Sequence, residues 1–175
     1  KAIAYLRLDQ TRVPEYPIVD YLPTNGKLRN QKYPKAGDPN PIPSVHVVEV
    51  EAPGAGVSIS ATPDDFYVAP EMAWTADSTA VALLKMNRAQ DRVEVTLLSR
   101  NGQSSKVLLV ESDPAWVNSL EPPRFLKDGS FLWVSERSGF FHLYWDAANG
   151  TLKNAVTSGK WMVDPGEPWE VDEAT

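Results

Sequence analysis

The stretch MAWTADSTAVALLKMN, Met72–Asn87, returns later in the chain as PRFLKDGSFLWVSER, Pro123–Arg137. The two superpose with an aromatic residue on an aromatic residue and an aspartate on an aspartate, 51 residues apart. Further on, LSRNGQSSKVLL and WDAANGTLKNAV align, with Asn101 and Asn149 48 residues apart. Four short strands that recur about every 40–50 residues are typical of a β-propeller blade. An antiparallel sandwich also repeats strands and turns, but the shared Asp-containing and Asn-Gly turns favour blades.

The rest of the chain indicates the same all-β class. Short runs rich in β-branched and aromatic residues lie between turns formed by 15 prolines and 10 glycines. In RVEVTLLSR the apolar residues alternate with polar ones, as in a half-buried strand. No segment longer than about ten residues has a helical period. The expected strands are Ala2–Leu8, Tyr16–Leu22, Val45–Glu51, Val57–Ala61, Phe66–Trp74, Ala80–Met86, Val93–Ser99, Lys106–Val110, Arg124–Leu126, Phe131–Ser135, Phe141–Asp146 and Ala155–Thr157.

These strands predict about three consecutive blades, at residues 1–61, 62–112 and 113–163, with 164–175 leading into a next blade. The segment AIAYLRL also resembles the second strand of an earlier unit. The proline-rich run YPKAGDPNPIPS, Tyr33–Ser44, precedes the strand beginning near Val45. Prolines hold such a connection extended, so we expect an insertion over one face of the blades or a rigid linker.

Composition excludes several classes of function. The net charge is −6 and the basic residues are scattered, so no surface for nucleic acid or anionic membranes is predicted. No apolar run approaches the roughly 20 residues that span a bilayer. Cysteine is absent, which removes disulfides and thiolate sites. The chain opens on KAIAYLRLD without a methionine, and we expect a piece of a longer polypeptide.

Three stretches resemble the N-terminal propeller region of the dipeptidyl peptidase IV family, within the prolyl oligopeptidase group. They are YPKAGDPNP, the long segment WVNSLEPPRFLKDGSFLWVSERSGFFHLYWDAANG, and LKNAVTSGKWMV. The family carries a YPKAG-x-x-NP segment and an F-x-x-DG-x-F strand that leads into a Ser-Glu-Arg and His-Leu-Tyr hairpin. The resemblance covers the chain from Ala2 to about Val163 and is weakest at 12–30.

The resemblance implies that these blades belong to a propeller, usually eight-bladed, which caps an α/β-hydrolase domain. In the family this cap restricts access to a Ser-Asp-His site that removes N-terminal dipeptides. The hydrolase domain and peptide substrates are therefore the implied partners, and a periplasmic or secreted location is implied too. The family's adjacent glutamates, which bind the substrate's amino terminus, lie upstream of the matching stretch. The adjacent acids Asp64-Asp65 and Asp172-Glu173 do not match them, and WVNSLEPP has no arginine before Arg124.

The residues themselves predict no catalytic site in this chain. A serine hydrolase of this group needs a G-x-S-x-G turn between a strand and a helix. The nearest string, GAGVSIS, places Ser60 where the last glycine should stand. The only histidines, His46 and His142, fall inside expected strands, and a blade-packing role is expected for His142.

No cofactor or metal is predicted either. Asp9, Asp38, Asp64 and Asp65 lack the spacing of a calcium loop. No glycine-rich phosphate loop is present. A cluster of acids and tryptophans could form a glycan site with paired carboxylates, although solvated loop charges are the simpler explanation. It comprises Trp161, Asp164, Glu167, Trp169 and Glu170.

Two functions therefore stay open. One is a non-catalytic segment of a peptidase that gates and orients peptides for a hydrolase domain. The other is an independent propeller-like module that binds a protein or a glycan. In either case an arc of blades leaves apolar faces uncovered, so we expect the isolated chain to self-associate.

Overall fold

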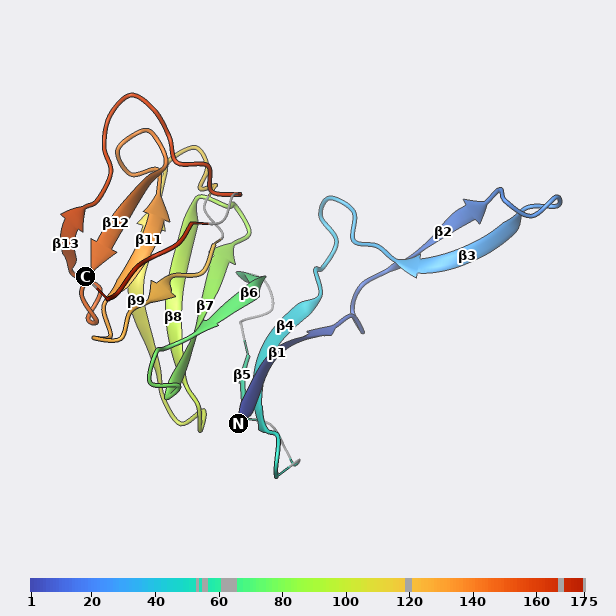
Figure 1. The fold of residues 1–175 in the computed structure, drawn as a ribbon. Helices are drawn as coiled ribbons and strands as arrows, with labels where there is room; N and C mark the ends of the chain where they lie inside the picture. The colour runs from blue at the N-terminus through green and yellow to red at the C-terminus, as the bar shows by residue number, and fades with distance from the viewer. Residues whose placement is uncertain (53, 55–56, 61–65, 119–120, 167–168, 175) are drawn as a thin grey trace.

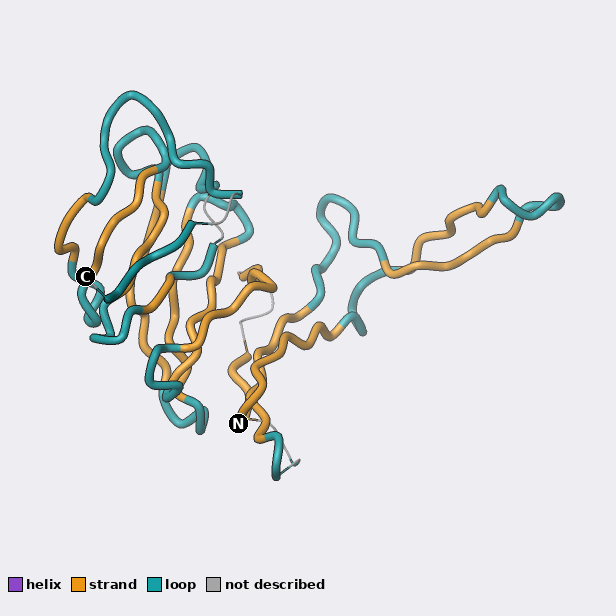
Figure 2. The backbone as a smooth tube through the Cα atoms, viewed as in Figure 1, coloured by secondary structure: helices purple, strands orange, loops and turns teal. Residues whose placement is uncertain are grey.

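The computed structural model describes all residues except 53, 55–56, 61–65, 119–120, 167–168 and 175, and its described part contains strands but no helix (Figures 1 and 2). The strands are β1 (Ala2–Asp9), β2 (Glu15–Asp20), β3 (Lys27–Lys32), β4 (Ile42–Glu49), β5 (Val57–Ser60), β6 (Phe66–Trp74), β7 (Ala80–Asn87), β8 (Arg92–Ser99), β9 (Ser105–Ser112), β10 (Arg124–Phe125), β11 (Phe131–Ser135), β12 (His142–Asp146) and β13 (Leu152–Ala155). The predicted all-β class is confirmed.

Three antiparallel sheets follow one another along the chain. The first has the order β1-β4-β5, the second β6-β7-β8-β9 and the third β10-β11-β12-β13. The last two are the expected four-stranded blades, with each strand hydrogen-bonded to its neighbour in sequence. In the first sheet β1 and β4 occupy the places that β7 and β8 have in the second, which agrees with the resemblance of AIAYLRL to a second strand.

The repeat seen in the sequence is also present in the turns. Asp77 accepts a hydrogen bond from the backbone N–H of Thr79, and Asp128 accepts the equivalent bond from Ser130. The residue between each pair, Ser78 or Gly129, has a positive φ, of 57° and 82°. In such a turn the aspartate carboxylate accepts the bond that a backbone carbonyl would otherwise accept, which is why aspartate recurs there.

The Asn-Gly turns match in the same way. Asn101 and Asn149 each accept a bond from the backbone N–H two residues later. Gly150 has a φ of 87°, and a Cβ on it would lie 2.0 Å from the carbonyl oxygen of Leu108. A glycine is therefore required both by the turn and by the close approach of the third sheet to β9.

The second sheet is covered on both faces, because the sheets pack face to face. Val81, Leu83 and Leu98 contact Val45 and Val47 of the first sheet. The opposite side of the second sheet packs against the third, and the core residues of this interface are Ala82, Leu84, Met86, Val93, Val95, Leu108, Val117, Phe131 and Trp133. Burial on both faces explains why β7 is a continuous apolar run rather than an alternating one.

The prediction for the first blade was wrong in one element. The expected strand at Tyr16–Leu22 is β2, but it pairs only with β3, in a separate two-stranded hairpin. This hairpin projects away from the three sheets (Figure 1). β3, with the polar sequence KLRNQK, carries no apolar alternation and was not expected as a strand. The first sheet consequently has three described strands and not four.

The proline-rich run returns the chain from the hairpin to β4. Lys35 Nζ lies 3.9 Å from the ring centroid of Tyr16 on β2. The carbonyl of Asp38 accepts a bond from Arg88 Nη2, beyond the end of β7, at 3.0 Å. The run therefore connects the hairpin base to the second sheet. Pro43 lies inside β4, opposite Leu8 of β1, whereas β5 pairs only with residues 44–47.

The last strand was predicted a few residues too late, at Ala155–Thr157. β13 covers Leu152–Ala155, directly after the Asn-Gly turn, and its side chains are exposed. An exposed edge strand has no apolar alternation to reveal it. The blade boundaries at 61, 112 and 163 remain a prediction, since the sheets fix only their strands.

Candidate functional site

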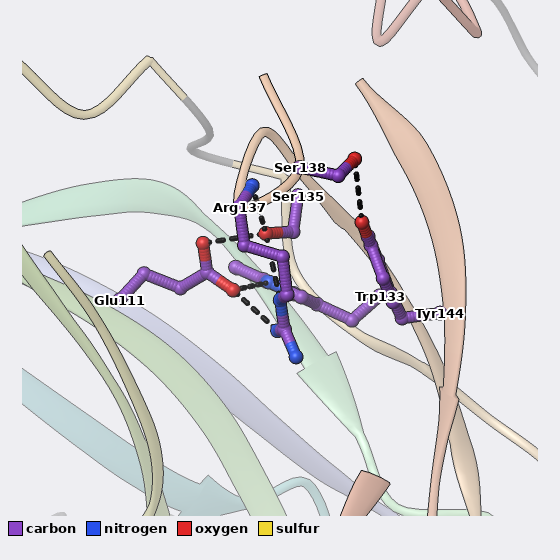
Figure 3. Close-up of polar contacts among 6 residues, drawn as sticks. All are labelled: Glu111, Trp133, Ser135, Arg137, Ser138 and Tyr144. Carbon is purple, nitrogen blue, oxygen red and sulfur yellow. Dashed lines mark hydrogen bonds and ion pairs between the residues drawn. The ribbon is translucent and has the colours of Figure 1, made fainter. Parts of the chain in front are cut away.

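Glu111, near the end of β9, joins the second sheet to the third (Figure 3). Its Oε1 accepts a bond from Trp133 Nε1 at 2.9 Å, and its Oε2 accepts one from Ser135 Oγ at 2.7 Å. Arg137 Nη2 also donates to Oε1 and forms an ion pair with it. The Glu111 side chain is 10% exposed, so these bonds replace most of its water.

The arginine of this cluster is held from three sides. Its Nε donates to Ser135 Oγ at 3.0 Å, and its backbone N–H donates to the same oxygen at 3.1 Å. The guanidinium lies over the Tyr144 ring, 4.5 Å from the centroid. Tyr144 in turn bonds Ser138 through its hydroxyl at 2.9 Å (Figure 3). The planar guanidinium suits this combination of carboxylate pairing and ring stacking.

The cluster has the chemistry of a clamp between blades. Ser135 gives its hydroxyl proton to a carboxylate and receives two N–H donors from Arg137. All of these bonds engage the Ser135 hydroxyl in the contact between the second and third sheets. The sequence analysis did not identify Glu111. The only signal was the family-like Ser-Glu-Arg segment, two members of which are its partners.

The first pair of sheets is joined by a simpler contact. Arg100 donates from Nε to Glu49 Oε1 at 2.6 Å and from Nη2 to Oε2 at 2.5 Å. The two side chains are 35% and 44% exposed. The hydrogen bonds from Arg100 hold the pKa of Glu49 below its usual value.

Both histidines have structural partners. His46 Nε2 lies 3.0 Å from Ser44 Oγ, and the ring stacks on Tyr5 at 5.2 Å. His142 lies 3.0 Å from Thr157 Oγ1 and 3.1 Å from the carbonyl of Gly159, one contact for each ring nitrogen. Within the described residues the partners of both rings are hydroxyls, a carbonyl and aromatic rings.

The predicted acid and tryptophan cluster is divided among separate contacts. Trp161 meets the His142 ring edge-on, at 5.0 Å. Asp164 accepts a bond from its own loop, at Gly166. Trp169 and Glu170 both contact Arg124, the first residue of β10. Of the carboxylates that the structure describes, Asp164 and Glu170 therefore make separate contacts. Glu167 lies outside the described residues.

The remaining predictions concern Ser60, Asp64 and Asp65, metal binding and membrane spans. Asp64 and Asp65 lie outside the described residues, and Ser60 is placed in β5 by its backbone alone. In the described part of the chain no three His, Cys, Asp or Glu side chains are grouped to hold a metal ion. No helix in that part is long and apolar enough to cross a membrane.

The chain is similar in sequence to a known protein family and to curated proteins. The family model for the dipeptidyl peptidase IV N-terminal region matches residues 1–175. The chain is 29% identical to "Probable dipeptidyl-aminopeptidase B" of Coccidioides posadasii, over 93% of its own length and 20% of that protein. It is 27% identical to dipeptidyl peptidase 4 of Trichophyton equinum, over 92% of its length and 22% of that protein.

A solved structure agrees. The crystal structure of Porphyromonas gingivalis dipeptidyl peptidase 4 superposes with a TM-score of 0.79 and 28% identity, over 93% of this chain and 24% of that one. The chain thus spans about a fifth to a quarter of the proteins it matches. Because the family model and the stacked sheets both extend over the described chain, it belongs to the dipeptidyl peptidase IV N-terminal region family.

Proposed function

We propose that this chain is a non-catalytic propeller segment of a serine-type dipeptidyl peptidase. In this role it gates and orients peptide substrates for an α/β-hydrolase domain elsewhere in the parent polypeptide. The observation that carries the proposal is the family match over residues 1–175, in a region that forms only about a fifth of the matched peptidases.

The arrangement of side chains supports a structural role for the segment. The serine and both histidines described above are bonded to partners within or between blades, as expected of residues that hold the sheets together. Packed sheets with buried interfaces form a stiff wall, and a stiff wall can exclude substrates by size. Size exclusion requires that the wall keep its shape while peptides enter.

The proposal also predicts a neighbour for the outer face of the first sheet. Ile3 and Tyr5 are 53% and 41% exposed there, opposite the face that packs on the second sheet. In the parent we expect a further blade to cover this face. The isolated chain is then expected to self-associate through it. Light scattering over micromolar to millimolar concentrations tests this, and a strictly monomeric mass would contradict it.

The functional test compares the purified chain with its parent on an Xaa-Pro chromogenic amide. We expect hydrolysis by the parent and none by the chain alone. The parent should also cleave short peptides much faster than long unfolded proteins if the blades restrict access. A parent without hydrolase activity would favour the independent binding module, whereas hydrolysis by the chain itself would contradict a non-catalytic role.

A further inference from the structure

A cleft of about 630 Å³ lies between β9 and the third sheet, and we refer to it as the β9 cleft. It is lined on one side by β9 and the segment that follows it, and on the other by the β11–β12 connection and by β12 and its turn. The lining residues that matter for its chemistry are Glu111, Asp113, Trp116, Glu136, Arg137 and Asp146.

Asp146 is the unusual member of this lining. It is 2% exposed, and within the part of the chain that the structure describes its Oδ2 has no hydrogen-bond partner. Its neighbour two residues earlier on β12, Tyr144, pairs with Trp133, which bonds Glu111 of β9. Since alternate residues of a strand share a face, Asp146 is directed to the same side of the sheet as Tyr144. A buried carboxylate without a partner is costly, so it calls for an explanation.

The charges of the β9 cleft favour a cation. Four carboxylates line it, against the single guanidinium of Arg137. Arg137 is already paired with Glu111. Asp113 accepts from the backbone of Ala115 and Trp116, and Glu136 accepts from Asn118. Of the four, Asp146 is the one whose side chain is both buried and left with an oxygen that no donor of the described residues bonds.

The kind of cation follows from the remaining geometry. A divalent ion takes six or more oxygen ligands, whereas both oxygens of Glu111 are committed to protein donors. A single carboxylate suits a monovalent ammonium group. Apolar side chains, including Leu152 at 46% exposure, and the half-exposed indole of Trp116 also line the cleft. Such walls pack against the methylene stem of an alkylammonium, and an indole face attracts its charge.

We propose that the β9 cleft binds the ammonium group of a lysine side chain from a peptide or partner protein, with Asp146 as its counter-ion and Trp116 against its stem. This site requires no hydrolase chemistry, so it stands or falls independently of the proposed function.

The test is a calorimetric or NMR titration of the purified chain at pH 8 with n-butylammonium, using n-butanol as the uncharged probe of the same stem. We expect saturable binding of n-butylammonium with a Kd on the order of 1 mM, and at least tenfold weaker binding of n-butanol. Asp146→Asn should weaken n-butylammonium binding at least tenfold. Glu71→Gln, which removes an exposed charge of β6 outside the cleft, should leave it unchanged.

A second variant and a pair of peptides test the same site without relying on Asp146→Asn. Trp116→Ala alters a half-exposed side chain, so the fold should survive even if Asp146→Asn misfolds, and we expect severalfold weaker binding. A capped Gly-Lys-Gly peptide should bind at least as well as n-butylammonium, and its acetyl-lysine counterpart should not. Equal binding of n-butanol, an unchanged affinity in both cleft variants, or no saturation would overturn the site. Binding of n-butylammonium without the lysine peptide would overturn its assignment to a peptide.

Discussion

The two interfaces between the sheets enclose clefts of similar volume, about 610 and 630 Å³, yet they are closed by different chemistry. At the first, Glu49 and Arg100 form a half-exposed pair at the rim. At the second, the side chain of Glu111 is only 10% exposed and accepts bonds from an indole, a hydroxyl and a guanidinium together. A rim pair exchanges its bonds with water readily, whereas a buried carboxylate depends on each partner.

The difference between the two interfaces indicates which of them holds the three sheets more rigidly. The buried core of the first interface consists of valines and leucines, with Trp74 only partly buried against it, whereas the second buries the large rings of Phe131 and Trp133 completely. Large rings bury more area, and a donor on one of them fixes the relative position of the sheets. We expect the second interface to tolerate change less than the first.

The largest effect should come from Trp133→Ala. The side chain is 1% exposed, and its loss leaves a cavity and removes the donor to Glu111. Deletion of a buried tryptophan costs about 3–5 kcal/mol of unfolding free energy. Chemical denaturation of the variant, with the half-exposed Val107→Ala of β9 as control, measures it. A loss no larger than that of the control would show that the second interface is not the stiffer one.

A smaller effect should come from Glu111→Gln. The amide keeps the shape of the side chain but turns an acceptor into a donor and leaves the Arg137 charge without its counter-ion. We expect a loss of about 1–3 kcal/mol, the cost of leaving buried polar groups unsatisfied. In a cycle with Arg137→Met, the double variant should lose less than the sum of the singles. Strict additivity would mean that the ion pair of the second interface acts no differently from an exposed one.

The sequence predicted those parts of the fold that local chemistry determines. The turn at Asp77 and its repeat at Asp128 use one side chain to hold one backbone N–H, so their spacing could be read directly. The apolar residues of strands β6 to β8 predict those strands. β3 and β13 do not, because exposed polar strands carry no burial pattern.

The candidate sites were harder to predict, for a physical reason. Glu111 bonds residues 22 to 26 positions away, and Asp146 shares a cleft with Glu111, 35 positions earlier, across an interface between two sheets. Sequence shows the residue types but not which side chains lose water when the blades stack. The tryptophans and acids from Trp161 to Glu170 show the converse limit, since residues close in sequence make contacts as different as the His142 ring and the Arg124 guanidinium.

The smallest loss of unfolding free energy should come from Glu49→Gln at the first interface. This variant distinguishes the two interfaces most directly. Hydrogen bonds from Arg100 lower the pKa of Glu49 in the folded state. A carboxyl with a lowered folded pKa binds fewer protons than in the unfolded chain. Its contribution to stability is therefore full above the unfolded pKa and is lost as the pH falls through the folded pKa.

Glu49→Gln should accordingly unfold slightly more easily than the native chain at neutral pH, and the difference should vanish in acid. Because the pair is half exposed, added salt should shrink the neutral-pH difference. Denaturation curves at several pH values and two salt concentrations, with Glu71→Gln as a control for a lost exposed charge, measure this. A neutral-pH loss as large as that of Glu111→Gln would remove the contrast between the interfaces, because it would mean that a solvated rim pair fixes the blades as firmly as a buried cluster.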